Sequence, residues 1–217
     1  MVKELVLKII SLKQIDSTQL YLKKLIQSQQ EKAPVAVVAD VQTQGVGSRN
    51  NSWISHEGNL FLSFALPLES LPNDLKLESA SIYFAYILKE TLTAFGSEVI
   101  LKWPNDFYLN EKKIGGMITT VVGKTIICGV GLNLVSCETE FAKLDIVIEK
   151  NNLLESYFLN LEKSFLWKQV FSKYKLEFYT NKKFFTHKDG QKISLDMVEL
   201  EDDGCIRING ERMYSRR

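Results

Sequence analysis

The order of apolar and polar residues along the chain predicts alternating strands and helices. Charged residues are interspersed among apolar ones over residues 1–10, and we expect a strand at 4–10. Capping side chains at residues 16–18 then open a helix with apolar residues at helical spacing. We expect further strands at 35–39, 60–66, 98–101, 114–122 and 125–135, a loop at 42–52, and helices at about 76–95 and 151–178.

The pattern changes after Phe185. Short apolar stretches at 193–195, 197–200 and 205–208 alternate with turn residues, which predicts a small antiparallel β-module. The expected fold class is therefore α+β: a mixed β-sheet with helices on one face, followed by this module. We place the main domain at 1–180 and the C-terminal module at 181–217.

Composition narrows the class of protein. The formal net charge is +1 over 217 residues, so no basic excess indicates nonspecific binding to nucleic acid. No apolar run approaches the roughly twenty residues of a membrane helix, and the N-terminus lacks the features of a signal peptide. Three irregularly spaced cysteines and two isolated histidines predict neither a disulfide framework nor a structural metal. We expect a cytoplasmic protein that does not associate with membranes.

The run Lys102-Trp103-Pro104-Asn105-Asp106 carries the most specific chemistry. Proline ends the preceding strand, and the Asn-Asp pair favours a turn, so the run predicts a rigid corner at the mouth of a sheet. Lys113 and a pair of glycines follow seven to ten residues later. Cations beside a carboxylate suit a nucleotide with its magnesium ion, because cations contact phosphate oxygens and a carboxylate contacts the metal.

Three further segments are ambiguous when each is taken alone. Residues 16–18 suit a helix N-cap, and the same hydroxyls and amides suit a small polar ligand. The Gly-x-Gly loop at 42–49 lacks the strand–helix context of a dinucleotide fingerprint, so we reject a Rossmann site. Glycines at 129 and 131 interrupt an apolar strand, which often marks close approach of another group to the backbone.

In this order and spacing, the motifs resemble those of the biotin–protein ligases, also called biotin–[acetyl-CoA-carboxylase] ligases. The resemblance covers residues 16–135, and the C-terminal module resembles the family's small SH3-like domain. It implies a class II synthetase-like catalytic domain that makes biotinyl-5′-adenylate from biotin and ATP with Mg²⁺. A lysine of the biotin carboxyl carrier protein would then receive the biotin.

Residue roles are carried over from the resemblance by position. Lys113 would be the main catalytic cation, and Asp106 would help to orient or deprotonate the incoming lysine. The expected biotin-binding residues are Ser17, Thr18, Gln42, Gly45, Val46, Gly47, Lys113, Gly116, Gly129 and Gly131. The expected nucleotide-binding residues are Ser48, Arg49, Trp53, Lys102, Asn105, Asp106, Lys113 and Asn133.

Two departures from the family pattern matter. Val46 and Ser48 stand where many members carry arginine, and valine and serine cannot grip phosphate bidentately. Our hypothesis is that Arg49 takes over part of that role and that the adenylate is held less tightly. The motifs also begin within twenty residues of Met1, which leaves no room for a DNA-reading domain, so we expect no DNA binding. A monomer and a homodimer both remain open, and the alternatives are a lipoate-type cofactor ligase and a non-enzymatic biotin-binding module.

Overall fold

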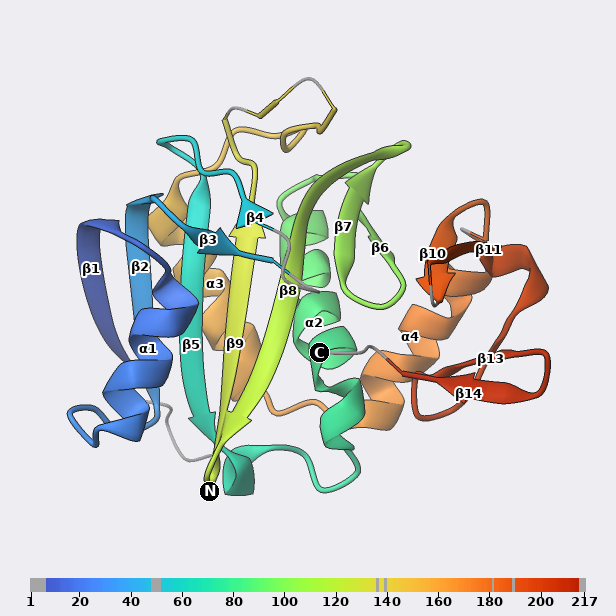
Figure 1. Ribbon diagram of the computed structural model, residues 1–217, viewed down its shortest axis with the longest axis horizontal. Coiled ribbons are helices and arrows are strands. Elements are labelled where there is room, and N and C mark those ends of the chain that lie inside the picture. Colours follow the sequence, from blue (N-terminus) through green and yellow to red (C-terminus); the bar gives the residue numbers. More distant parts are fainter. Residues whose placement is uncertain are drawn as a thin grey trace.

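A seven-stranded sheet forms the frame of the protein, in the order β1-β2-β5-β9-β8-β7-β6 (Figure 1). The computed structural model describes residues 7–47, 52–135, 137–138, 140–180, 182–188 and 190–214. The strands are β1 (Lys8–Ile15), β2 (Val35–Gln42), β5 (Leu60–Pro67), β6 (Ile100–Lys102), β7 (Asp106–Leu109), β8 (Lys112–Val122) and β9 (Thr125–Leu132). β1 pairs with β2 in parallel, and the other neighbours pair antiparallel. The predicted mixed sheet is confirmed.

Helices cover both faces of this sheet. On one face, α1 (Thr18–Gln27) packs Leu22 and Leu25 against alternate residues of β2, β5 and β9, such as Val37. On the other, α2 (Ala80–Ala94) and α3 (Lys150–Glu162) cover the intervening residues, such as Phe64 and Cys128. Figure 1 shows α1 in front of the sheet and α2 and α3 behind it. The flanking helices are confirmed, but our expectation of helices on one face was wrong, because α1 buries the opposite set of alternating side chains.

The long helix predicted at 151–178 is two helices, α3 and α4 (Trp167–Thr180). Ser164 between them has φ of +47°, which a continuous helix does not permit. The carboxylate of Asp74 accepts hydrogen bonds from the first backbone amides of α4, at 2.8 Å from Trp167 N and 3.1 Å from Lys168 N. A residue distant in sequence therefore caps α4, so the sequence around residue 167 does not reveal where this helix begins.

Other boundaries shift by a few residues. The first predicted strand, 4–10, lies partly outside the described residues, and β1 runs over Lys8–Ile15. A 3₁₀ turn (Leu77–Ser79) precedes α2, another (Leu68–Ser70) follows β5, and β9 ends at Leu132 rather than at 135. The predicted loop at 42–52 contains a short hairpin of β3 (Gly45–Val46) and β4 (Ser52–Trp53). β7 was not predicted.

The C-terminal segment forms two small sheets, as the sequence predicted in outline. One pairs β10 (Phe185–Lys188) with β11 (Gln191–Ser194), and the other joins β12 (Glu199–Leu200), β13 (Ile206–Ile208) and β14 (Glu211–Met213). A 3₁₀ turn (Leu195–Met197) connects them. Their buried side chains belong to the same apolar cluster as α2 and α4. Within the described residues, no helix has the length and apolar character needed to cross a membrane.

Candidate functional site

Most of the sequence-predicted site residues line one cavity on the α1 face of the sheet. It lies where the start of α1, the end of β2, the β3–β4 hairpin and strands β5, β7, β8 and β9 meet. Twelve of the predicted residues line it: Ser17, Thr18, Gln42, Val46, Gly47, Trp53, Asn105, Asp106, Lys113, Gly116, Gly129 and Gly131. Segments far apart in the sequence are therefore brought together at a single site.

Strand register arranges this site in two rows across the sheet. In the first row, Ser63, Gly129 and Ile118 are register partners on β5, β9 and β8. In the second row, Gly131, Gly116, Asp106 and Lys102 are partners on β9, β8, β7 and β6. The rows are two residues apart along β9, so both face the same side of the sheet, separated by roughly 6.6 Å.

The first row ends in a buried polar pocket beneath the start of α1. Thr18 Oγ1 lies 2.9 Å from Ser63 Oγ, and both the amide and the hydroxyl of Thr18 donate to Gln42 Oε1, at 2.8 and 3.0 Å. Of the two expected caps, Ser17 and Thr18, Ser17 is the helix N-cap, and its hydroxyl accepts from Leu20 N at 3.4 Å. Hydroxyl, amide and carboxamide groups thus converge on a small volume.

Gln19 adds an unsatisfied acceptor to this pocket. Its Nε2 donates to Ile127 O at 3.4 Å, but its buried Oε1 has no hydrogen-bond partner among the described atoms. A buried acceptor without a partner is costly, so this oxygen suits a ligand that brings an N–H donor.

Glycines make the floor of the cavity. A Cβ on Gly129 would lie 2.5 Å from Gln19 Oε1, and one on Gly131 would lie 2.7 Å from the Trp53 ring. A Cβ on Gly116 would lie 3.1 Å from Asp106 Oδ1. Larger residues at these positions would push away the groups above them, so the glycines let a ligand lie directly on the strand backbone.

The second row leads to the charged end of the cavity. Lys113 Nζ lies 2.6 Å from Asp106 Oδ1 and 6.0 Å from the centre of the Trp53 ring. The turn before Asp106 is tied to β8, because Met117 N donates to Asn105 O at 3.0 Å and Asn105 Nδ2 donates to Met117 O. A half-buried cation held beside a carboxylate can stabilise negative charge that develops on a ligand.

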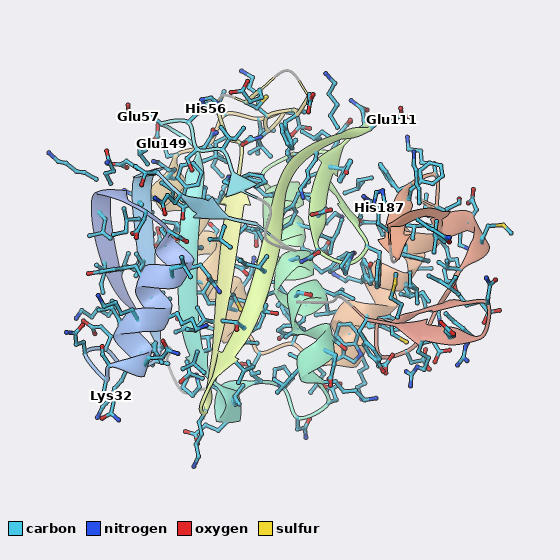
Figure 2. The ribbon with its side chains drawn as sticks, in the orientation of Figure 1. Lys32, His56, Glu57, Glu111, Glu149 and His187 are labelled. Atoms are coloured by element: carbon cyan, nitrogen blue, oxygen red, sulfur yellow. The ribbon has the colours of Figure 1, made fainter. Side chains whose placement is uncertain are left out.

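Asp106 is the carboxylate that suits a magnesium ion carried by phosphate. Mg²⁺ is commonly bound by one or two carboxylates together with substrate phosphates and water. In the described part of the chain, no group of three or more His, Cys, Asp or Glu side chains is arranged to hold a metal ion. Figure 2 shows His56 on the loop after β4 and His187 on β10, well apart, and His56 Nε2 lies 3.1 Å from Glu138 Oε1.

Five predicted residues do not line the cavity or are not described. Lys102 lies in the second row, where its Nζ is 5.0 Å from the centre of the Tyr108 ring. Asn133 is buried and ties two loops together, accepting from Asn59 Nδ2 at 3.3 Å and donating to Ala142 O at 3.1 Å. Gly45 adjoins the cavity, where a Cβ would lie 2.6 Å from the Trp53 carbonyl oxygen. Ser48 and Arg49 lie outside the described residues, so their roles stay predictions.

The structure adds cavity residues that the sequence had not indicated: Gln19, Ser63, Met117, Ile118 and Val130. Ser63 was detectable in principle, because it is the only polar residue in the apolar run of β5 (Leu60–Pro67). Gln19 directly follows the Asp16–Thr18 motif but falls within the helix, where a glutamine is ordinary.

Comparison with known proteins identifies one protein family. The family model of the biotin/lipoate A/B protein ligases matches residues 11–133. The bifunctional ligase/repressor BirA of Escherichia coli is 35% identical over 127 residues, which are 55% of this chain and 38% of that protein. Biotin–protein ligase 2 of Arabidopsis thaliana is 36% identical over 107 residues, 45% of this chain and 32% of that protein. The chain thus spans less than two fifths of the length of these curated relatives.

Solved structures match over almost the whole chain. Biotin acetyl coenzyme A carboxylase synthetase from Helicobacter pylori, with biotinylated ATP bound, has a TM-score of 0.91 and 37% identity. That match covers 95% of this chain and 99% of the Helicobacter protein. The biotin protein ligase from Aquifex aeolicus, in complex with biotin and ATP, has a TM-score of 0.77 at 24% identity and supports the fold alone.

Proposed function

Because the chain belongs to the biotin/lipoate A/B protein ligase family, we propose that it is an ATP-dependent biotin–protein ligase. The observation that best supports this proposal is that a single cavity contains both a polar pocket and a lysine–carboxylate pair, with glycines on the strands beneath them. A ligand with a polar ring at one end and a reactive carboxylate at the other fits this arrangement.

The first step would form biotinyl-5′-adenylate. A biotin carboxylate oxygen attacks the α-phosphorus of ATP, the bond to the β-phosphate oxygen breaks, and pyrophosphate leaves. Lys113 would contact both the carboxylate and the α-phosphate and stabilise the charge that accumulates there. Asn105 and Asp106 would position the nucleotide, and Trp53, which lies over Gly131, would contact the adenine.

The second step would transfer biotin to a lysine of a carrier protein. The lysine amine attacks the acyl carbon of the mixed anhydride, an amide forms, and AMP leaves. Asp106 would orient this amine or take its proton. Mg²⁺ bound with ATP would offset phosphate charge, and Asp106 is the residue that would hold it.

The polar pocket, which would bind the ring of the ligand, favours biotin over lipoate. Ser17, Thr18 and Gln42 would hold the ureido group, with Gly45, Val46 and Gly47 approaching through the backbone. Hydrogen-bonding groups in this pocket would be left unpaired by the dithiolane ring of lipoate, which argues against a lipoate-type ligase. Simple vitamin binding would not need Lys113 beside Asp106, which argues against a non-enzymatic module.

For the protein that accepts biotin, we propose a more specific identity than membership of the family alone indicates. The Helicobacter relative is named as an acetyl coenzyme A carboxylase synthetase, so we propose the biotin carboxyl carrier protein of that carboxylase. We also propose that residues 1–180 form the catalytic domain and that 181–217 form the SH3-like module.

The test is biotin-dependent release of pyrophosphate from ATP and Mg²⁺, with lipoate as the control ligand and a biotin carrier domain added afterwards. Pyrophosphate with biotin alone, followed by carrier biotinylation and AMP release, is the expected result. Tight biotin binding without pyrophosphate would contradict the proposal and favour a binding module.

A further inference from the structure

A turn of the C-terminal segment, Asp202–Gly204, is anchored at three successive carbonyl groups. Trp167 Nε1 donates to Asp202 O at 2.8 Å, Ser79 Oγ donates to Asp203 O, and Trp103 Nε1 donates to Gly204 O at 2.8 Å. All three donors come from the part of the chain that carries the seven-stranded sheet and its helices. Such a run of anchors fixes the position of the turn against that part.

The turn is also held in its own conformation. Gly204 has φ of +78°, and a Cβ there would lie 2.8 Å from Ile82 Cδ1. The carboxylate of Asp203 accepts from Arg212 Nη2 at 2.5 Å, from Tyr214 OH at 2.9 Å and from Lys76 Nζ at 3.1 Å. The acceptor offered to Trp103 is therefore fixed.

Trp103 connects this turn to the cavity. It is 2% exposed, and it is followed, after Pro104, by the Asn105 and Asp106 that line the cavity. Asn105 is tied to Met117 on β8, and Asp106 pairs with Lys113. The corner is thus held on one side by β8 and on the other by Gly204.

We propose that the Asp202–Gly204 turn is a positioning element for adenylation: through Trp103 it fixes Asn105 and Asp106 opposite Lys113. This inference rests on the proposed function. The residues of the turn are not among those that line the cavity. The effect of the turn is to restrict the motion of the corner at residues 102–106. The geometry of this corner affects the rate of adenylation, because a displacement of about 1 Å at a reacting centre can lower a reaction rate by up to 100-fold.

Trp167 provides a matched control. Its indole donates to Asp202 O, two residues before Gly204 in the same turn, over the same distance, but Trp167 begins α4 and leads away from the cavity. W103F and W167F each keep an aromatic ring and remove one indole donor. If the turn served stability alone, the two substitutions would have the same effect on the enzyme.

The experiment compares these two variants in the full chain. We expect both to lower the midpoint of thermal unfolding by about 2–4 °C, as the loss of one buried hydrogen bond predicts. Only W103F should lower kcat for biotin-dependent pyrophosphate release, by about 10- to 100-fold, with the Kd for biotin within about twofold of wild type. Equal losses of kcat in the two variants, or no loss in W103F, would overturn the proposal.

Hydrogen exchange at the Met117 amide gives a readout that needs no activity. This amide donates to Asn105 O, so it should exchange faster in W103F and unchanged in W167F. Should the wild-type chain release no pyrophosphate, the proposed function fails, while the exchange comparison still decides whether the turn holds the corner. If W103F does not fold, D203N loosens the turn with Trp103 intact, and the same kcat loss and faster exchange are expected; their absence would contradict the proposal.

Discussion

Lys113 Nζ lies 2.6 Å from Asp106 Oδ1, and the two residues come from neighbouring antiparallel strands rather than from one loop. Both side chains are about a quarter exposed, at 26% and 22%. The pair is therefore held on a rigid sheet yet remains open to a ligand, which is the placement that a charge-stabilising cation needs.

Replacement of Lys113 by alanine should lower the adenylation rate by about 100- to 1000-fold, because one preformed charge contact at the reacting oxygens is lost. The rate is measured as biotin-dependent pyrophosphate release at saturating ATP. Lys124→Ala, in the exposed β8–β9 turn, is the control and should retain the wild-type rate. A loss below about tenfold in K113A would contradict the catalytic role of Lys113.

Two glycines on β9 should separate the two ends of the cavity. Gly129→Ala would press on Gln19 in the polar pocket, so we expect the Kd for biotin to rise by about 10- to 100-fold. Gly131→Ala would displace the Trp53 ring, which we expect to contact the adenine, so the KM for ATP should rise by a larger factor than the Kd for biotin. Calorimetry with biotin and initial rates against ATP measure the two effects. The same effect from both substitutions would show that the two ends are not separate.

Twelve of the cavity-lining residues could be named from the sequence because they lie in short motifs that resemble those of a known family. Ser17 as a cap and the corner that ends at Asp106 follow from side-chain preferences that act over a few residues. Gln19 carries no such signal, and Ser63 stands out only as the one polar residue of its apolar strand, because the roles of both depend on a contact between α1 and the sheet. The same limit explains the break before α4: its cap, Asp74, lies 93 residues away from Trp167 in sequence.

Strand β7 (Asp106–Leu109) was missed for a different reason. It is four residues long and starts inside the corner motif, so the turn preference of Asn105 and Asp106 concealed its alternating burial. Its place in the sheet comes from pairing with β6 and β8, which is information outside the segment.

The Asp203 carboxylate should make the stability of the protein depend on pH in the acid range. Burial alone would raise the pKa of Asp203, but hydrogen bonds from Tyr214, Cys205, Lys76 and Arg212 hold it well below its usual range. A lowered folded-state pKa gives stability that is present above the unfolded-state pKa of about 4 and is lost as pH falls toward the folded-state value.

Asp203→Asn should therefore lower the unfolding midpoint at pH 7 by roughly 4–8 °C, since hydrogen bonds to a charged group are worth about 2 kcal/mol. Thermal unfolding of both proteins at pH 7, 4 and 3 measures the effect. The difference between wild type and D203N should shrink as the pH falls, and a constant difference would show that the charge of Asp203 is not its source.

The loop at 42–49 has Val46 and Ser48 where many family members carry arginine, so we expect it to hold the adenylate weakly. Two substitutions with opposite expected effects test this. Val46 lines the cavity, so Val46→Arg should slow the dissociation of biotinyl-5′-adenylate by about tenfold through a bidentate phosphate contact. Arg49→Ala should speed dissociation, an expectation that rests on the sequence alone. Release of labelled adenylate measures both. If R49A left adenylation and retention unchanged, our hypothesis for Arg49 would fail.

The two rows across the sheet set the length of molecule that can react. Gly129, beneath the polar pocket, and Asp106 are two strands apart and two residues apart along the strands, which amounts to roughly 12 Å. This distance is set by the pairing of the strand backbones, so a single side-chain replacement cannot alter it. A one-residue shift in strand register would turn every side chain of that strand to the opposite face. Biotin analogues whose carboxylate side chain is shorter or longer should therefore bind and fail to react. Reaction of an analogue with another side-chain length would require α1 or the β3–β4 hairpin to move.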